Sequence, residues 1–193
     1  VAVYHPTKLD SLYVQSNCNQ LYCNNILLQD LFTQLDINSI PVPEPVNKLK
    51  YFHYSGDIDG RLEDMRLHGA LRTALGVVRV NGNMYIDTTL QIIDLVGHVS
   101  TNQFQLGNLL GQKDLGNITF DAHIDGTIDS LKLTHCIAEA NVRNFDYLGY
   151  TYNHIHLDGE WNINEINGTL SINDDNLKLN IKGLADWDQN DTR

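Results

Sequence analysis

The chain has 193 residues, 42% of them hydrophobic, and a formal net charge of -11 at pH 7. This hydrophobic fraction is sufficient for a folded core, whereas the acidic charge opposes binding to nucleic acid and adsorption to anionic lipid headgroups. No apolar run approaches the roughly 20 residues that a membrane-spanning helix needs. The chain starts at Val1 without an initiator methionine and stops after a strand-like pattern, so we expect a segment of a longer protein.

Residues 1–46 are predicted to form a β section that ends in a proline-rich linker. Between Ile40 and Val46, three of the seven residues are prolines, which lack the amide donor that a central strand needs. The main β body is predicted to follow, from residue 47 to residue 193.

The three cysteines, Cys18, Cys23 and Cys136, have neither the number nor the spacing of a disulfide framework or a zinc site. We expect free thiols that are partly buried in a sheet. A Cys18–Cys23 bridge across a turn is the alternative.

The main body repeats part of its sequence. Ile58-Asp59-Gly60 returns as Ile124-Asp125-Gly126, an offset of 124 − 58 = 66 residues. Asn24–Leu28 has a weaker echo in Asn153–Leu157, an offset of 153 − 24 = 129 residues. Recurrence at nearly fixed intervals is typical of stacked units, which form elongated surfaces.

Alternation of apolar and polar residues dominates the main body. From Ile118 to Ile124, apolar residues occupy every second position, which is the spacing of a strand with one oily and one wet face. Such faces are typical of antiparallel sheets. Asn81-Gly82 lies between two apolar runs and predicts a hairpin turn, because both residues tolerate positive φ. Similar pairs are read as turns or as bulges inside strands: Asp59-Gly60, Asp125-Gly126, Asp158-Gly159 and Asn167-Gly168.

Three further segments complete the predicted elements. Arg61–Leu75 has helix-forming composition, but we predict a strand because its repeat counterpart, Thr127–Asn141, has strand-like spacing. Phe104–Gly111 places three leucines at positions i, i+3 and i+4, which predicts a short helix capped by Gly111. Asn173–Asn176 is predicted to be a polar loop between two strands.

The sequence contains no recognisable catalytic or cofactor motif. Nucleophile-elbow, P-loop and H-E-x-x-H patterns are missing, and the calcium-loop pattern fails after Asp57-Ile58-Asp59-Gly60. His154 and His156 are predicted to share a strand face, but a structural zinc site needs four ligands. We therefore expect no enzyme activity, no metal and no cofactor. A hydrolase site assembled from distant Asp and His residues is a third, less favoured interpretation.

The oily face is the remaining candidate for function. Two such faces can bury each other in a sandwich core, which the pattern alone favours, or the sheet can curl into an open trough that binds an apolar ligand. The wet face is predicted to carry Lys132, Asp121, His123, His156, Lys178 and Lys182. The predicted lining of the trough is Met84, Ile86, Ile118, Phe120, Ile124, Leu131, Leu133, Ile155, Leu157, Trp161, Leu170, Ile172, Leu177, Leu179 and Ile181.

Several strand-and-turn phrases resemble the periplasmic part of TamB-type proteins, within the AsmA-like group. They include Gly107-Asn108-Leu109-Leu110-Gly111, Leu115–Phe120, Ile155–Gly159 paired with Asn167–Ile172, and Asn176–Gly183. The high asparagine content is similar to that of versions from the Bacteroidetes. The resemblance covers about four-fifths of the chain, by comparison of these phrases with the family pattern.

The resemblance implies the fold and the function. It implies an all-β chain: an elongated antiparallel β-taco or groove, a curved meander with an apolar interior and at most one short helix. The full-length protein would be anchored in the inner membrane and cross the periplasm. It would carry phospholipid acyl chains toward the outer membrane and support assembly of outer-membrane proteins with a TamA-type barrel partner. The membrane anchor and the barrel-binding region of the family are not recognisable here.

Two further expectations concern binding. A repetitive β module that binds carbohydrate or protein, as adhesins do, is the alternative function, with Tyr147, Tyr150, Tyr152 and Trp161 as its aromatic platform. Open sheet edges also make self-association a natural property of such a chain.

Overall fold

A computed structural model of the chain describes residues 2–4, 13–24, 47–61, 63–87, 92–129 and 132–186. None of the helices in this part of the chain has the length and hydropathy needed to cross a bilayer. The elements are β1 (Ala2–Tyr4), β2 (Tyr13–Asn24), β3 (Tyr51–Arg61), β4 (Asp64–Thr73), β5 (Gly76–Asp87), β6 (Ile92–Phe104), α3 (Leu106–Leu110), β7 (Leu115–Asp129), β8 (Lys132–Tyr147), β9 (Tyr150–Asn162), β10 (Glu165–Asn173) and β11 (Lys178–Asp186).

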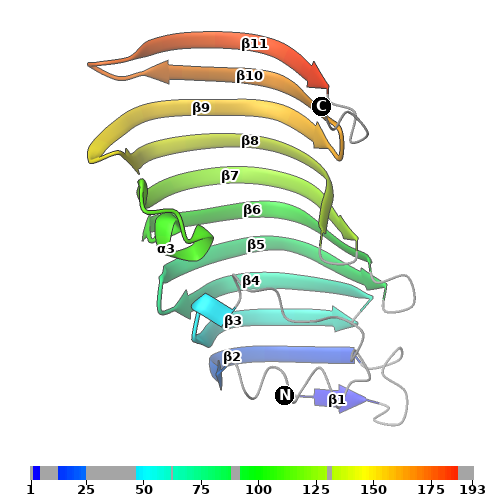
Figure 1. Cartoon of the computed structure of the whole chain (residues 1–193). Helices are drawn as coiled ribbons and strands as arrows, with labels where there is room; N and C mark the ends of the chain where they lie inside the picture. Colours follow the sequence, from blue (N-terminus) through cyan, green and yellow to red (C-terminus); the bar gives the residue numbers. More distant parts are fainter. Residues whose placement is uncertain are drawn as a thin grey trace.

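The strands form one 11-stranded sheet in which the spatial order equals the chain order. Each strand pairs antiparallel with the next. Figure 1 shows a single curved layer, with β1 and β11 at opposite ends of the stack. The predicted all-β fold, a curved antiparallel meander, is confirmed. The sandwich is wrong for the described strands, because they make one sheet rather than two facing layers.

Short connections explain why neighbouring strands pair in chain order. Leu148-Gly149 joins β8 to β9, and its φ angles of 51° and 79° are both positive. Positive φ at both central residues matches the turn to the right-handed twist of the flanking strands. The Leu148 amide also donates a hydrogen bond to the Asp114 carbonyl oxygen at 2.8 Å, which holds the turn beside the β6–β7 connection.

The hairpin predicted at Asn81-Gly82 is wrong. Both residues lie in the middle of β5, where Asn81 pairs with His98 and Gly82 pairs with Gly97 of β6. The valines before this point and the Met84–Ile86 run after it continue one strand rather than two. The four other Asp-Gly and Asn-Gly pairs also lie inside strands, while Asn173–Asn176 does contain the turn between β10 and β11.

The predicted helix is confirmed as α3, which lies beside the ends of β6 and β7 (Figure 1). Gly111 caps it in the left-handed conformation, with φ of 70°. Next to this helix, Leu75 and Phe104 are buried with 7% exposure each. The Gln105 amide donates to the Leu75 carbonyl oxygen at 2.9 Å, so the β4–β5 turn and the start of α3 are held together.

Most of Arg61–Leu75 is strand, as predicted: Arg61 ends β3, Asp64–Thr73 is β4, and Leu75 lies in the turn before β5. The described part of its counterpart belongs to β7 and β8, but the repeat does not extend to the strand pairing. Ile58 pairs with Leu67, whereas Ile124 pairs with Ala138. An offset of 66 would place Leu67 on Leu133 instead. In the second echo, Asn153–Leu157 lies within β9, whereas residues 25–28 of the first copy lie outside the described residues.

The N-terminal section contributes to the same sheet as the main body. β2 pairs along its length with β3, while the proline-rich linker lies outside the described residues. Cys23 and Cys136 are free thiols with intermediate burial, as predicted. The Cys18 side chain is outside the described part of the chain.

Candidate functional site

One face of the sheet is apolar across β3 to β11. Because side chains alternate between faces and paired residues share a face, the registers align apolar residues in rows that cross the strands. One row is Tyr54–Leu71–Val78–Thr101–Phe120–Val142–Ile155–Ile172–Leu179. The next is Gly56–Gly69–Val80–Val99–Ala122–Ala140–Leu157–Leu170–Ile181. Neither row contains a charged residue, and we call this side the apolar face.

Most of the predicted lining residues lie on the apolar face by register. Two do not belong to this set: Leu131 is outside the described residues, and Leu177 lies in the turn before β11, where its carbonyl oxygen accepts a hydrogen bond from Asp174. Leu177 precedes Lys178, the first residue of β11, and therefore has no partner in the sheet register. The residues on the apolar face are Met84, Ile86, Ile118, Phe120, Ile124, Leu133, Ile155, Leu157, Trp161, Leu170, Ile172, Leu179 and Ile181.

The structure adds apolar-face residues that the sequence analysis missed, mostly on β3 to β6. The same period-two signal was present in these segments, but the turn assigned to Asn81-Gly82 divided β5 and hid the continuity. The added residues include Ile58, Leu67, Leu71, Val78, Val80, Leu95 and Val99.

Burial differs along the apolar face. Val142 and Ile155, near the α3 side, are buried at 6% and 9% exposure. Farther along β9, Leu157 and Trp161 are 41% and 43% exposed, and Ile181 on β11 is 50% exposed. Within the described residues no second sheet covers these side chains. Contiguous exposed apolar surface of this kind usually marks a site for an apolar ligand or partner.

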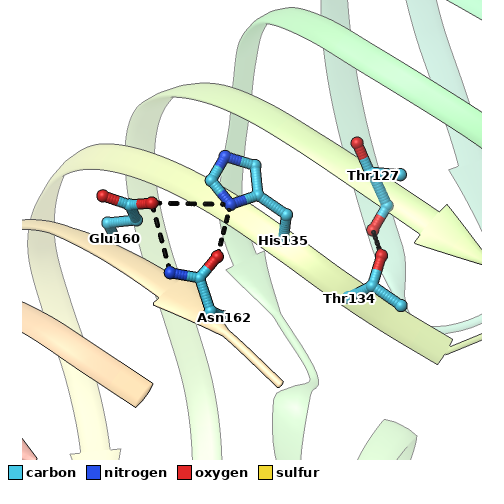
Figure 2. Close-up of polar contacts among 5 residues, drawn as sticks. All are labelled: Thr127, Thr134, His135, Glu160 and Asn162. Carbon is cyan, nitrogen blue, oxygen red and sulfur yellow. Dashed lines mark hydrogen bonds and ion pairs between the residues drawn. The ribbon is translucent and has the colours of Figure 1, made fainter. Parts of the chain in front are cut away.

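A bulge in β8 keeps Leu133 on the apolar face. Thr127 pairs with His135 and Ile128 pairs with Leu133, so Thr134 is an extra residue in the ladder. Its hydroxyl donates to the Thr127 carbonyl oxygen at 3.1 Å (Figure 2). The extra residue restores the alternation on both sides of the bulge.

The opposite, polar face carries hydrogen-bonded side chains that link neighbouring strands. In Figure 2, His135 Nδ1 lies 2.8 Å from Asn162 Oδ1 and 3.7 Å from Glu160 Oε1. Asn162 Nδ2 donates to Glu160 Oε1 at 3.2 Å. Because Nδ1 faces oxygen acceptors, it is the donor nitrogen of the imidazole ring. This cluster ties β8 to β9 without contributing to the apolar face.

The residues predicted for the wet face lie on the polar face wherever their side chains are described. His98 Nε2 lies 2.9 Å from Asp121 Oδ2, and His156 Nδ1 lies 2.9 Å from Asn141 Oδ1. In the β8–β9 register, Asn153 and Ile155 each have a partner, whereas His154 between them has none. The φ angle of His154 is 54°. The alternation that predicted a shared face for His154 and His156 is therefore broken at this position. His123, Lys178 and Lys182 are exposed on the polar face, and Lys132 pairs with Asp129 in the backbone register.

Asp174 holds the β10–β11 turn against β9, a role that the sequence analysis missed. Its carboxylate accepts hydrogen bonds from the Tyr150 hydroxyl at 2.6 Å, the Asn153 amide at 2.9 Å and the Asn176 amide at 3.0 Å. These bonds, that from Tyr150 first, lower the pKa of Asp174 to about 2. The same contact raises the pKa of Tyr150. The residue is 3% exposed.

The four aromatic residues of the carbohydrate interpretation do not form one platform. Tyr147 pairs with Tyr150, and the rings of Tyr150 and Tyr152 meet edge to face with centroids 4.8 Å apart. Trp161 lies near the other end of β9, opposite Cys136 and Ile166. The tyrosines therefore gather beside the β8–β9 turn, and Trp161 lies toward the opposite end of β9.

Comparison with known proteins adds no relative. No protein-family model, no curated protein sequence and no solved structure matches this chain.

Proposed function

We propose that the apolar face binds the acyl chains of phospholipids, and that this chain is a periplasmic segment of a TamB-like protein that carries lipid between the inner and outer membranes. One observation supports the proposal most strongly: rows of uncharged, mostly apolar residues cross the sheet from β3 to β11 with no second sheet over them in the described part of the chain. Burial of an acyl chain on this face would favour binding by about 0.8 kcal/mol for each CH₂ group removed from water.

Lipid movement along the stack needs no bond-making step. Each strand presents equivalent apolar positions to the next strand, so the binding free energy changes little from one row position to another. Small residues such as Gly159 and Gly168 lie opposite each other between rows of bulkier side chains. No side chain protrudes from the apolar face at these two positions. A charged headgroup would stay in water, because burial of an unpaired charge is costly.

Several parts of the proposal concern the full-length protein. We infer an inner-membrane anchor, a location in the periplasm, and a TamA-like barrel as partner in outer-membrane protein assembly. The chemistry of binding requires neither enzyme activity nor a cofactor. The sheet edges at β1 and β11 are the surfaces through which copies of the chain would associate.

Native mass spectrometry of the purified, delipidated chain tests the proposal. After incubation with phosphatidylethanolamine vesicles, we expect lipid-bound species, and saturable uptake of a fluorescent fatty acid in a parallel titration. Protein that remains ligand-free in both experiments would contradict the proposal. Glycan binding without lipid uptake would favour the adhesin-like alternative.

β11 offers a matched pair of variants for this experiment. Ile181 is on the apolar face and Leu184 is on the polar face of the same strand, and they are 50% and 59% exposed. Ile181→Asp should weaken fatty-acid binding by at least about fivefold, because it places a charge beside the chain. Leu184→Asp adds the same charge to the opposite face and should leave binding within about twofold of wild type. Equal losses in both variants would argue against the apolar face as the binding surface.

A further inference from the structure

A hollow on the polar face, separate from the apolar face, has the chemistry of a second binding site. It has a volume of about 580 Å³ and lies over β2 to β6. Its lining includes Gly56, Gly69 and Val80. Two rows of polar-face positions border these residues. One row is Asn17–Asp57–His68–Asn81–His98, and the other is Ser55–Ala70–Arg79–Ser100.

Arg79 lines this hollow and carries a permanent positive charge. It pairs with Ala70 on one side and Ser100 on the other, and both neighbours have short side chains. Arg79 is exposed, and it makes no hydrogen bond or ion pair with the described residues. Its guanidinium group therefore keeps its donors available to a bound molecule.

Two carboxylates beside the hollow, those of Asp57 and Asp121, each contact another side chain. Asp57 accepts a hydrogen bond from Asn17 Nδ2 at 2.7 Å. Asp121, beside Ser100 in the register, lies 2.9 Å from His98 Nε2. Ser55, Ser100 and the Asn81 amide add further donors to the lining. The hollow thus combines the Arg79 guanidinium with several further donors, and these groups complement a ligand that is rich in acceptor oxygens.

We propose that this hollow binds an oxyanion, the phosphate or carboxylate group of a small polar molecule, with Arg79 as its main contact. Arginine forms bidentate, charge-assisted hydrogen bonds with such groups. The hydroxyls of Ser55 and Ser100 and the amide of Asn81 complete the set of donors. The net charge of -11 repels anions at long range, so binding is local and weak, with millimolar dissociation constants for a free ion.

The test is an NMR titration of the ¹⁵N-labelled chain at constant ionic strength, with inorganic phosphate, sodium acetate and sodium chloride as separate probes. Saturable shifts of the Gly56, Gly69 and Asn81 amides with phosphate, with acetate or with both, and none with chloride, are the expected result. A response to phosphate alone identifies the phosphate class, and a response to acetate alone identifies the carboxylate class. The absence of saturable shifts with both oxyanions would overturn the proposal.

Arg66 supplies a matched control on the same face. It is an exposed β4 residue opposite Asp59 and Asn83, outside the lining of the hollow. Arg79→Gln should weaken binding by at least about fivefold, and Arg66→Gln should change it by less than about twofold. Retained shift dispersion shows that each variant is folded. Equal effects of the two substitutions would overturn the proposal, since they would reflect net charge rather than this site.

Discussion

Gly97 on β6 lies directly opposite Gly82 on β5, so closely that a Cβ atom added to Gly97 would be 2.5 Å from the Gly82 Cα atom and 2.6 Å from the Asn81 carbonyl oxygen. Real Cβ atoms essentially never approach other heavy atoms within 3.0 Å. The two strands can keep this separation only with glycine at this position of the apolar face.

Substitution of this glycine should destabilise the sheet. Gly97→Ala forces the backbones of β5 and β6 apart, and we expect a loss of about 1–3 kcal/mol in the free energy of unfolding, as for other overpacked sites. The midpoint of urea unfolding, followed by far-ultraviolet circular dichroism, measures this loss.

Gly183→Ala is the matched control, because a Cβ atom at Gly183 would meet nothing within 4 Å. Its stability should be unchanged or higher by about 0.5 kcal/mol, since alanine restricts the unfolded chain. If both variants lose the same stability, close approach of the strands is not what requires glycine at position 97.

Asp174 makes the stability of the chain sensitive to acid. Its pKa is about 2 in the folded state against an ordinary value of 3.8, so the folded state binds the proton of this carboxyl group less readily. A lowered pKa stabilises the fold above the unfolded value, and this contribution disappears as the pH falls from about 4 to about 2. Asp174→Asn should be less stable than wild type at pH 7 and should lose less stability between pH 4 and pH 2.

Thermal unfolding at pH 7, pH 4 and pH 2 measures this effect. Asp175→Asn removes a neighbouring exposed carboxylate that forms none of the Tyr150, Asn153 and Asn176 hydrogen bonds. It should follow the wild-type profile. Identical pH profiles for Asp174→Asn and wild type would show that the Asp174 contacts do not contribute to stability.

Cys136 provides a chemical probe within the apolar face. It pairs with Gly126 and Trp161, and burial, followed by the charge of Asp125, raises its pKa. Since the thiolate is the reactive form, alkylation in a Cys18→Ser/Cys23→Ser background should be slower than in the urea-unfolded chain. The increase of its alkylation rate with pH should also occur at a higher pH than in the urea-unfolded chain. A bound acyl chain should slow the reaction further.

Iodoacetamide labelling followed by intact-mass analysis gives these rates. The urea-unfolded protein is the reference for an ordinary thiol. A pH–rate profile that coincides with that of the unfolded chain would contradict the placement of Cys136 in the sheet. A rate unaffected by saturating fatty acid would contradict acyl binding over Cys136.

Period-two patterning predicted the strands and the members of the apolar face because it reflects the pleat itself. From Met84 to Ile181, the predicted lining residues within the described strands lie on one face. The patterning could not show whether that face was covered, since a sandwich and a single curved layer have the same alternation. Strand pairing in chain order decides between them, and it depends on contacts across the whole sheet.

Turn chemistry was the least reliable guide. Asn81-Gly82 has the composition of a hairpin but lies inside β5, where Gly82 is required by the approach of Gly97. Leu148-Gly149 lacks the usual asparagine and does form a turn, with the Leu148 amide bonded to Asp114. In both places long-range pairing outweighs local preference. The same reason hides the Asp174 contacts, which exist only after β9 and the β10–β11 turn come together.

Trp161 allows the most direct test of acyl binding to the apolar face. It is 43% exposed on that face, and a Trp187→Phe background leaves it as the sole tryptophan. Titration with a fatty acid brominated along its chain should quench its fluorescence saturably, whereas the unbrominated fatty acid should not. Absence of quenching at concentrations that saturate a fluorescent acyl probe would contradict the account.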